Sequence, residues 1–464
     1  MLVQQFFVEG LAHSSYLLGG TESCAIIDPQ RDVEIYLAAA QAHGLKITHI
    51  LETHLHADFI SGHMDLAEQT GAAIYAPKAG KCGFRHIGLS EGDAVAIDDM
   101  RIAVLDTAGH TPEHISYVVA DLERGEEPAA VFCGDTLFVG DVGRPDLFPG
   151  RAAELASKLF DNLHGKLLKL PDYCEVYPAH GAGSLCGRAM AAKRTSTIGY
   201  ERIKNPSLQI REKSAFIASL TTDMPVAPDH FARCSAVNGA GPAPVRTLPT
   251  PVAVSAELFE ARARETGVVV LDIRPFDAFG GQHVPGAWNI DINGNFATFA
   301  GWTLPADSEI LIVADNETSV QTAAVWLRRV GLDRVTGFLE GGMLGWSIAG
   351  LPTEHIPQLS PKELNQLIRS NSELIVLDVR SRQEFEGMCI PGALNIPAPE
   401  MRTQYTELPR DEQIVTVCST GMRSSLAAGI LQRHGFKDII NLAGGMKGYA
   451  AAGFLTQHSP AGRG

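Results

Sequence analysis

Short apolar runs of strand length alternate with stretches of helical period along most of the chain. Upstream of residue 221 these runs include CAIID at 24–28, ITHILETH at 47–54, AAVFCGD at 129–135 and CEVYPAHG at 174–181. A helix is predicted from Ser61 to Gly71, after the second of these strands. Each of the last three strands leads into a histidine or an aspartate. The pattern therefore predicts an α/β protein in which polar side chains collect at strand ends.

The pattern repeats itself in the C-terminal half. LDIRPFDAF at 271–279 returns as LDVRSRQEF at 377–385, and VPGAWNI at 284–290 returns as IPGALNI at 390–396. Each copy has two strand-like apolar runs, and the second run leads into an Ala/Leu-rich segment of helical period. Short strands that alternate with helices predict a parallel sheet covered on both faces. The half is therefore predicted to hold two copies of one domain.

Two proline-containing joints predict the domain limits. Residues 221–251 contain several prolines and no sustained helical or strand period, and a second joint lies near 352–360. The predicted domains are residues 1–240, 250–352 and 358–458.

Composition narrows the class of protein. The 464 residues carry a formal net charge of −15, without a basic stripe, which argues against nucleic acid and anionic membranes as partners. The hydrophobic content of 45% and the charged content of 20% are typical of a soluble globular protein. Eight cysteines without CxxC pairs indicate reduced thiols. With neither an export signal nor a transmembrane run in the sequence, we expect a cytoplasmic protein.

Metal-ligand residue types gather at the strand ends of the first domain. In THLHAD at 53–58 the alternate positions of an extended segment can converge on one point. Further candidates lie in AGHTPEH, FCGD and YPAHGAG, each in a loop after an apolar strand. Any one of them alone would suit a hydrogen-bonded loop residue, but jointly they predict a metal site. The six candidates are His54, His56, Asp58, His110, Asp135 and His180.

These motifs resemble the ordered motifs of the metallo-β-lactamase superfamily, in its glyoxalase II and persulfide dioxygenase branch. The resemblance implies an αββα sandwich, and it maps the mononuclear metal triad of the persulfide dioxygenases onto His54, His110 and Asp135. Two-metal members have a histidine directly after the motif aspartate, where this chain has Phe59. A second metal site would therefore lack one ligand. Two histidines and one carboxylate suit one non-haem Fe(II), with zinc as the alternative.

The same resemblance gives supporting roles to residues around the metal. Arg144 would face a substrate carboxylate or phosphate, and Cys186 would relay sulfur near the metal. A solvated arginine and a buried small thiol stay open as the alternatives. The residues expected to orient ligands or contact substrate are His56, Asp58, His180, Arg144, Cys186 and Tyr200.

A cysteine loop follows the second strand of the last domain. QIVTVC ends in Cys418, and STGMRSS leads into a helix-like segment that places Arg423 close by. Inward-pointing amides at a helix N-terminus stabilise a thiolate or persulfide. The C-x4-R spacing is one residue shorter than in tyrosine phosphatases, which argues against a phosphatase.

Together with LDVR, IPGALNIP and LAGGMKGY, this loop resembles the rhodanese family, in which the loop cysteine carries the transferred sulfur. The resemblance implies two three-layer α/β/α domains with parallel sheets, and it makes Cys418 and Arg423 the catalytic residues. The rest of the persulfide loop would be Ser419, Thr420, Gly421, Met422 and Ser424.

The first copy and one further cysteine depart from this pattern. In VADNETSVQTAA either Ala314 or Asp315 falls where the cysteine would be, and the loop has no arginine. The first copy is therefore predicted to be silent in sulfur transfer, with a structural or docking role. Cys389 stands where the family has a histidine, as an extra shuttle thiol or a packed cysteine.

The leading hypothesis is a bifunctional sulfur enzyme with one Fe(II) per chain. It would oxidise a low-molecular-weight thiol persulfide, of the glutathione, coenzyme A or bacillithiol type, with O2 to sulfite and thiol. Cys418 would move sulfane sulfur between persulfide, sulfite and thiosulfate. The alternative is a zinc-dependent thioester hydrolase of the glyoxalase II kind fused to a rhodanese. The oligomeric state, a homo-oligomer included, stays open.

Overall fold

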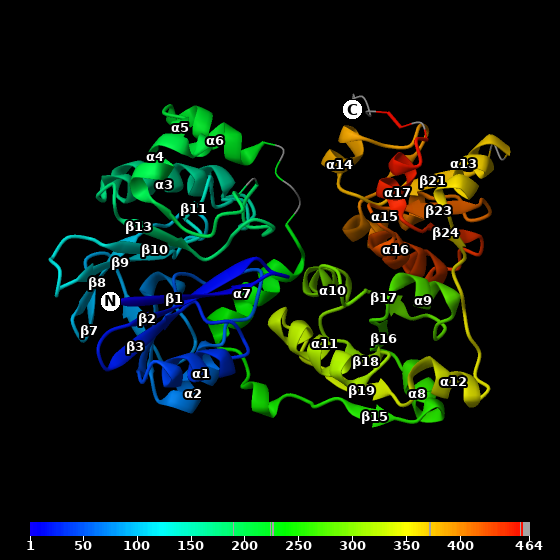
Figure 1. The fold of residues 1–464 in the computed structure, drawn as a ribbon, viewed down its shortest axis with the longest axis horizontal. Coiled ribbons are helices and arrows are strands. Elements are labelled where there is room, and N and C mark those ends of the chain that lie inside the picture. Colours follow the sequence, from blue (N-terminus) through cyan, green and yellow to red (C-terminus); the bar gives the residue numbers. More distant parts are fainter. Residues whose placement is uncertain (189, 223, 225–226, 371–372, 455, 458–464) are drawn as a thin grey trace. The chain divides into compact units, whose positions relative to one another are not determined.

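In the computed structural model, the chain forms two compact units (Figure 1). Residues 189, 223, 225–226, 371–372, 455 and 458–464 lie outside the described part of the chain, and these include the predicted end of the third domain at 458. The three predicted domain limits stay a prediction. The first unit holds residues 1–248 with 328–331, and the second holds 249–327 and 332–464.

Two six-stranded sheets form the centre of the first unit. Their facing sides bury alternate residues of each strand, among them Tyr16, Ile27, Tyr117 and Phe132, in one core between the sheets. The first sheet, in spatial order, is β1 (Leu2–Val8), β2 (His13–Gly19), β3 (Ser23–Ile27), β4 (Lys46–Leu51), β5 (Ala73–Pro77) and β6 (Ile87–Leu89). The second is β14 (Ser196–Thr197), β13 (Glu175–Pro178), β10 (Ala130–Gly134), β9 (Ile115–Asp121), β8 (Met100–Asp106) and β7 (Ala94–Ile97), and a small hairpin joins β11 (Leu137–Phe138) to β12 (Asp141–Val142).

Helices cover the outer faces of both sheets (Figure 1). The apolar sides of α1 (Glu34–Ala42) and α2 (His63–Thr70) pack on the first sheet, and those of α3 (Ala152–Gly165) and α6 (Lys213–Thr221) pack on the second. This is the predicted αββα sandwich. The remaining helices are α4 (Ile198–Lys204), α5 (Pro206–Gln209) and α7 (His230–Ala240).

Two helices differ from the prediction. α2 begins at His63 rather than Ser61, because the Ser61 hydroxyl donates to Glu52 and does not cap the helix. α7 lies inside the segment predicted to have no sustained period. Its sequence, HFARCSAVNGA, holds a glycine and several weak helix formers, so propensity did not predict it. Burial of Phe231, Cys234 and Asn238 stabilises it instead.

The second unit contains two five-stranded sheets whose described strand pairs all run parallel, as predicted. Both have the same strand order. The first sheet is β15 (Val252–Val254), β19 (Val335–Leu339), β18 (Glu309–Val313), β16 (Val268–Asp272) and β17 (Trp288–Asn289), with helices α8 (Ala256–Ala263), α9 (Phe276–Gly281), α10 (Phe296–Thr303), α11 (Glu317–Arg329) and α12 (Gly342–Ile348). The second is β20 (Gln358–Leu359), β24 (Ile439–Leu442), β23 (Ile414–Val417), β21 (Ile375–Asp378) and β22 (Leu394–Asn395), with α13 (Pro361–Ser370), α14 (Arg382–Gly387), α15 (Met401–Gln404), α16 (Met422–Arg433) and α17 (Gly445–Ala451).

The repeated LD-x-R motif forms the same buried ion pair in each copy. Arg274 donates through Nε and Nη2 to Asp272, at 2.9 Å and 2.5 Å, and Arg380 pairs with Asp378 in the same way. All four side chains are buried. The motif therefore marks a structural pair that fixes the end of β16 and of β21.

We expect Asp272→Ala to destabilise the first copy by about 3 kcal/mol, because the change leaves Arg274 buried without its counter-charge. The four tryptophans all lie between residues 288 and 346, so tryptophan fluorescence during urea unfolding reports on this copy. Glu265→Ala, at an exposed position of the same copy, is the control. A loss below about 1 kcal/mol for Asp272→Ala would contradict the structural role of the pair.

Candidate functional site

Three of the predicted ligands meet at one buried point. Each follows a strand end: His54 lies after β4, His110 after β8 and Asp135 after β10. Asp135 Oδ2 lies 3.2 Å from His110 Nε2 and 3.8 Å from His54 Nε2. Of these three atoms none has a hydrogen-bond partner among the described residues, although all are buried. The three donors thus face one another across a space of metal-site size.

Hydrogen bonds from the Nδ1 atoms orient the rings of His54 and His110. His110 Nδ1 lies 2.8 Å from the Arg144 carbonyl, to which only an N–H can bond. The Thr53 hydroxyl donates to Asp28, so its oxygen accepts from His54 Nδ1 at 2.9 Å. Both histidines therefore carry their hydrogen on Nδ1 and direct a lone pair from Nε2 into the site.

The electrostatics of the cluster favour a neutral pair of imidazoles and an ionised carboxylate. Burial, followed by the neighbouring His56, lowers the pKa of His54, and burial likewise lowers the pKa of His110. Burial opposes ionisation of Asp135, but His180 and His110 outweigh it and lower the pKa of this carboxyl. Neutral nitrogen and anionic oxygen are the forms that ligate metals.

The donor set therefore fits a metal ion. Two nitrogen lone pairs and one carboxylate oxygen, all buried and without protein partners, have the chemistry of a three-ligand site with open positions. His54, His110 and Asp135 are the residues that could hold it.

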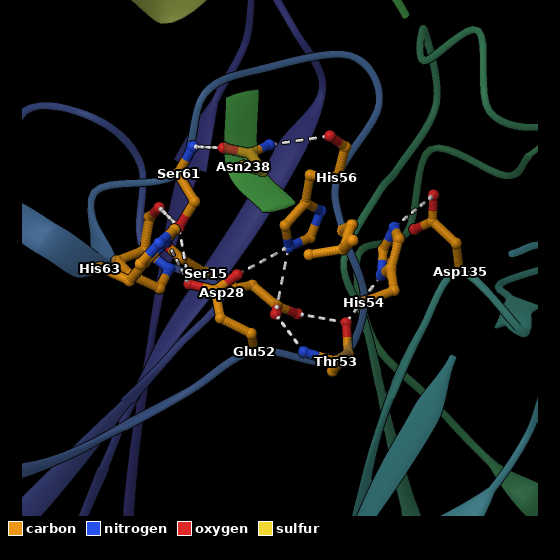
Figure 2. A network of polar contacts seen from close by, with 12 residues as sticks. Ser15, Asp28, Glu52, Thr53, His54, His56, Ser61, His63, Asp135 and Asn238 are labelled. Atoms are coloured by element: carbon orange, nitrogen blue, oxygen red, sulfur yellow. Dashed lines mark hydrogen bonds and ion pairs between the residues drawn. The ribbon is translucent and has the colours of Figure 1, made fainter. Parts of the chain in front are cut away.

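His56 belongs to a second polar cluster beside this site. Its Nε2 lies 3.1 Å from Asp28 Oδ1 and 3.7 Å from Glu52 Oε2 (Figure 2). Burial alone would lower the pKa of His56, but the charge of Asp28 and then that of Glu52 raise it. Asp28 also accepts from the backbone N–H and the hydroxyl of Thr53. His56 and Asp28 thus brace the segment that carries His54.

Asn238 on α7 is a site residue that the sequence reasoning missed. Its amide accepts from the backbone N–H of Ser61 and donates to the His56 carbonyl (Figure 2). It also donates to the Phe59 carbonyl at 2.8 Å. These bonds fix the loop after β4 from outside the motif. A lone asparagine in a weak helix gives no signal in the sequence.

His114 was missed as well, although it lies in the quoted AGHTPEH motif. Its Nε2 accepts from the backbone N–H of Asp135 at 2.9 Å. Burial and the neighbouring His110 lower the pKa of His114 to about 3, so the ring remains neutral and can accept this bond. A second histidine in the motif was the available signal.

His180 connects two carboxylates of the site. Its Nδ1 lies 2.7 Å from Asp135 Oδ1, and its Nε2 lies 2.8 Å from Asp58 Oδ2. Burial would lower its pKa, but Asp135 and Asp58 raise it well above the usual value. Cys186 lies in the same group with Asp58 and His180, and burial raises its thiol pKa strongly. Phe59 packs against His13 and His56 with tilted rings, and its ring meets that of His180 edge-on at 6.5 Å.

Two predicted substrate contacts have other partners in the structure. Arg144 is buried, makes a two-pronged pair with Asp146 at 2.7 Å, and donates to the Leu185 carbonyl. Its own carbonyl holds His110. Tyr200 is 54% exposed on α4, with Lys193 over its ring. Their roles toward substrate stay predictions.

The sulfur-transfer loop lies between β23 and α16. The Gly421 N–H donates to Cys418 Sγ at 3.1 Å, and the Ser424 hydroxyl donates to the same sulfur at 3.3 Å. A Cβ on Gly445, in the LAGGMKGY motif, would lie 2.3 Å from the Cys418 carbonyl, so this approach requires glycine. The remaining predicted loop residues lie between Cys418 and Ser424 in the chain: Ser419, Thr420, Met422 and Arg423.

The cysteine-less copy contacts this loop. A Cβ on Gly421 would lie 2.9 Å from the ring of Phe276 on α9, and the Ser425 hydroxyl donates to Asn289 on β17 at 2.8 Å. Ala314 directly follows β18, as Cys418 directly follows β23, so Ala314 rather than Asp315 stands at the cysteine position.

Cys389 lies outside the loop. It pairs through its backbone with Gln457 and is buried, and burial raises its thiol pKa. These features agree with the packed-cysteine interpretation.

Comparison with known proteins gives the same domain order. Residues 8–180 match the metallo-beta-lactamase superfamily, and residues 255–349 and 360–452 each match the rhodanese-like domain. A solved metallo-beta-lactamase from Staphylococcus aureus is 34% identical, with a TM-score of 0.65, over 73% of this chain and 98% of that one.

Two kinds of curated relative match the N-terminal domain. Hydroxyacylglutathione hydrolase of Rhodospirillum rubrum is 40% identical over 34% of this chain. The chain spans only 58% of that enzyme, less than two thirds of its length. The mitochondrial persulfide dioxygenase ETHE1 of Mus musculus is 30% identical over 45% of this chain and 77% of its own length.

We expect His54→Ala, His110→Ala and Asp135→Ala each to reduce bound metal, measured by elemental analysis, to less than about a tenth of the wild-type content. His180→Ala should weaken metal affinity about 10- to 100-fold, because Asp135 then loses its orienting partner. The exposed His43→Ala is the control. Wild-type metal content in His110→Ala would show that the metal lies elsewhere.

Proposed function

Because the chain belongs to the metallo-beta-lactamase superfamily and carries two rhodanese-like domains, we propose that it is a persulfide dioxygenase joined to a sulfurtransferase. The first activity converts a thiol persulfide, O2 and water to the thiol and sulfite. The second moves sulfane sulfur through Cys418. The persulfide is of the glutathione, coenzyme A or bacillithiol type, and the location is cytoplasmic. Among the described residues no helix is both long and apolar enough to cross a membrane.

The observation that carries the dioxygenase proposal is the inner donor set. Two imidazole nitrogens and one carboxylate oxygen meet without protein partners, and Phe59 occupies the position at which two-metal relatives place another histidine. A set of two histidines and one carboxylate suits Fe(II), which when bound supplies the redox chemistry that activates O2. Zinc lacks that chemistry.

The chain's own residues hold and enclose this chemistry. His54 donates from Nδ1 to the Thr53 hydroxyl, and His110 donates from Nδ1 to the Arg144 carbonyl. These hydrogen bonds fix the orientation of both rings before substrate binds. His180 shares hydrogen bonds with Asp135 and Asp58, which fixes the carboxylate. All these groups are buried, and exclusion of water protects an oxidisable substrate from side reactions.

The sulfurtransferase proposal rests on the loop around Cys418. The sulfur accepts from the Gly421 N–H and the Ser424 hydroxyl, which stabilise negative charge on a thiolate or persulfide. Cys418 would attack the outer sulfur of a donor and keep it as a persulfide. A sulfite or thiol acceptor would then remove that sulfur and release the Cys418 thiolate.

A second candidate is a zinc-dependent thioester hydrolase fused to the same sulfurtransferase. The 40% identity to hydroxyacylglutathione hydrolase favours it, because that relative is more similar over the matched segment than the persulfide dioxygenase is. The two candidates use the same three ligands and differ in the metal.

The first test is oxygen uptake by anaerobically prepared full-length protein given glutathione persulfide. We expect the Fe(II)-loaded sample to consume O2 and form an equal amount of sulfite, and the zinc-loaded sample to consume none. Thioester hydrolysis by the zinc form, without oxygen uptake by the iron form, would establish the second candidate instead.

Two variants should separate the activities. We expect His110→Ala to abolish oxygen uptake while transfer of sulfur from thiosulfate continues, because Cys418 belongs to a different domain. Cys418→Ser should abolish sulfur transfer and leave oxygen uptake intact. Loss of both activities in either variant, with wild-type circular dichroism, would contradict two independent sites.

A further inference from the structure

Glu384 on α14 is a hydrogen-bond partner of two polar side chains in the Cys418 loop, Arg423 and Ser419. Arg423 donates from Nη1 and Nη2 to the two Glu384 oxygens, at 2.7 Å and 2.8 Å. The Ser419 hydroxyl donates to Glu384 at 3.0 Å and accepts from Arg423 at 2.7 Å. Three N–H···O bonds of the guanidinium are therefore made inside the protein.

The carboxylate is held in place independently of the loop. Glu384 forms a capping box with Ser381, whose backbone N–H donates to Glu384 Oε2 at 3.0 Å. Burial would raise the pKa of Glu384, but the hydrogen bonds and charge of Arg423 hold it at about 2. Glu384 is thus a fixed negative charge at neutral pH.

The cysteine-less copy lacks this whole arrangement. Alignment of LDIRPFDAF with LDVRSRQEF places Ala278 at the position of Glu384. Ala314 and Ser319 stand at the positions of Cys418 and Arg423. The carboxylate is therefore found in the copy that holds the reactive sulfur, and helix α9 forms without it.

Charge at the mouth of the loop follows from these contacts. A persulfide anion on Cys418 and the Glu384 carboxylate together outweigh the single positive charge of Arg423. A dianion such as sulfite or thiosulfate is repelled by this net negative charge about twice as strongly as a thiolate, which carries a single negative charge. The contacts from Gly421 and Ser424 are to the Cys418 Sγ itself.

We propose that Glu384 is a specificity residue that disfavours dianionic sulfur oxoanions at Cys418 and favours thiols as its exchange partners. The proposal rests on the proposed sulfur-transfer function of the loop. With sulfite, the sulfite lone pair attacks the outer sulfur, the S–S bond breaks, and thiosulfate and the Cys418 thiolate leave. With a thiol, its thiolate attacks the same sulfur and a new persulfide leaves. Total charge is conserved in both reactions.

The test compares discharge of sulfur from Cys418 in full-length wild type, Glu384→Gln and Glu386→Gln. Gln at position 384 can keep the capping box and removes only the charge. Glu386 lies exposed on the same helix and makes a matched control for loss of one charge. Each protein is charged anaerobically with glutathione persulfide, freed of donor, and mixed with sulfite or with dithiothreitol. Alkylation and peptide mass spectrometry follow the Cys418 persulfide.

We expect Glu384→Gln to accelerate discharge by sulfite about tenfold and discharge by the singly charged dithiothreitol thiolate only about threefold. Wild-type discharge by sulfite should rise with ionic strength, and the variant should lose most of this slope. Glu386→Gln should behave as wild type. A merely structural role would slow both acceptors and leave the salt slope unchanged.

Two results would overturn different claims. An unchanged or smaller ratio of sulfite to dithiothreitol rates in Glu384→Gln would refute the specificity role, while normal charging of Cys418 would uphold the transfer function. Failure of wild type to form any persulfide at Cys418 would refute the proposed sulfur transfer itself.

Discussion

Three buried polar atoms without protein partners set the local structure of the first unit. Burying an unpaired lone pair or carboxylate oxygen costs free energy, and a bound cation would satisfy all three atoms at once. The neighbouring residues keep these atoms directed inward. The Thr53 hydroxyl donates a hydrogen bond to Asp28, so its oxygen accepts one from His54 Nδ1. Asp28 and Thr53 therefore help to orient His54 toward the site.

This constraint explains which parts of the site the sequence could predict. Ligands that follow strands were predictable, because an apolar run ending in His54 or Asp135 marks both the strand and the side chain. Residues that hold the ligands through backbone contacts were not. Asn238 lies on a helix with little amphipathic signal, and it bonds to main-chain atoms that any sequence provides. The Arg144 carbonyl, which accepts from His110, likewise gives no signal in the sequence. The sequence predicted a role only for the Arg144 side chain.

More of the second unit could be predicted from the sequence, because its internal repeat allows the two copies to be compared with each other. Both copies keep the buried Asp–Arg pair at the end of the equivalent strand. The repeat predicted two domains with parallel sheets, but it left Ala314 and Asp315 open at the cysteine position, which the ends of β18 and β23 decide. Contacts between the copies, such as Phe276 against Gly421, could not be predicted, because the repeat describes each copy alone.

The differences between the copies separate what the fold requires from what the chemistry requires. The buried ion pairs Asp272–Arg274 and Asp378–Arg380 recur, so they belong to the fold. Cys418, Arg423 and Glu384 occur only in one copy, and they touch one another or share one loop. The copy without the cysteine nonetheless contacts the reactive loop. Its Phe276 ring lies against Gly421, and the Gly421 N–H donates to the Cys418 sulfur. A copy without chemistry of its own therefore helps to fix the geometry of its twin.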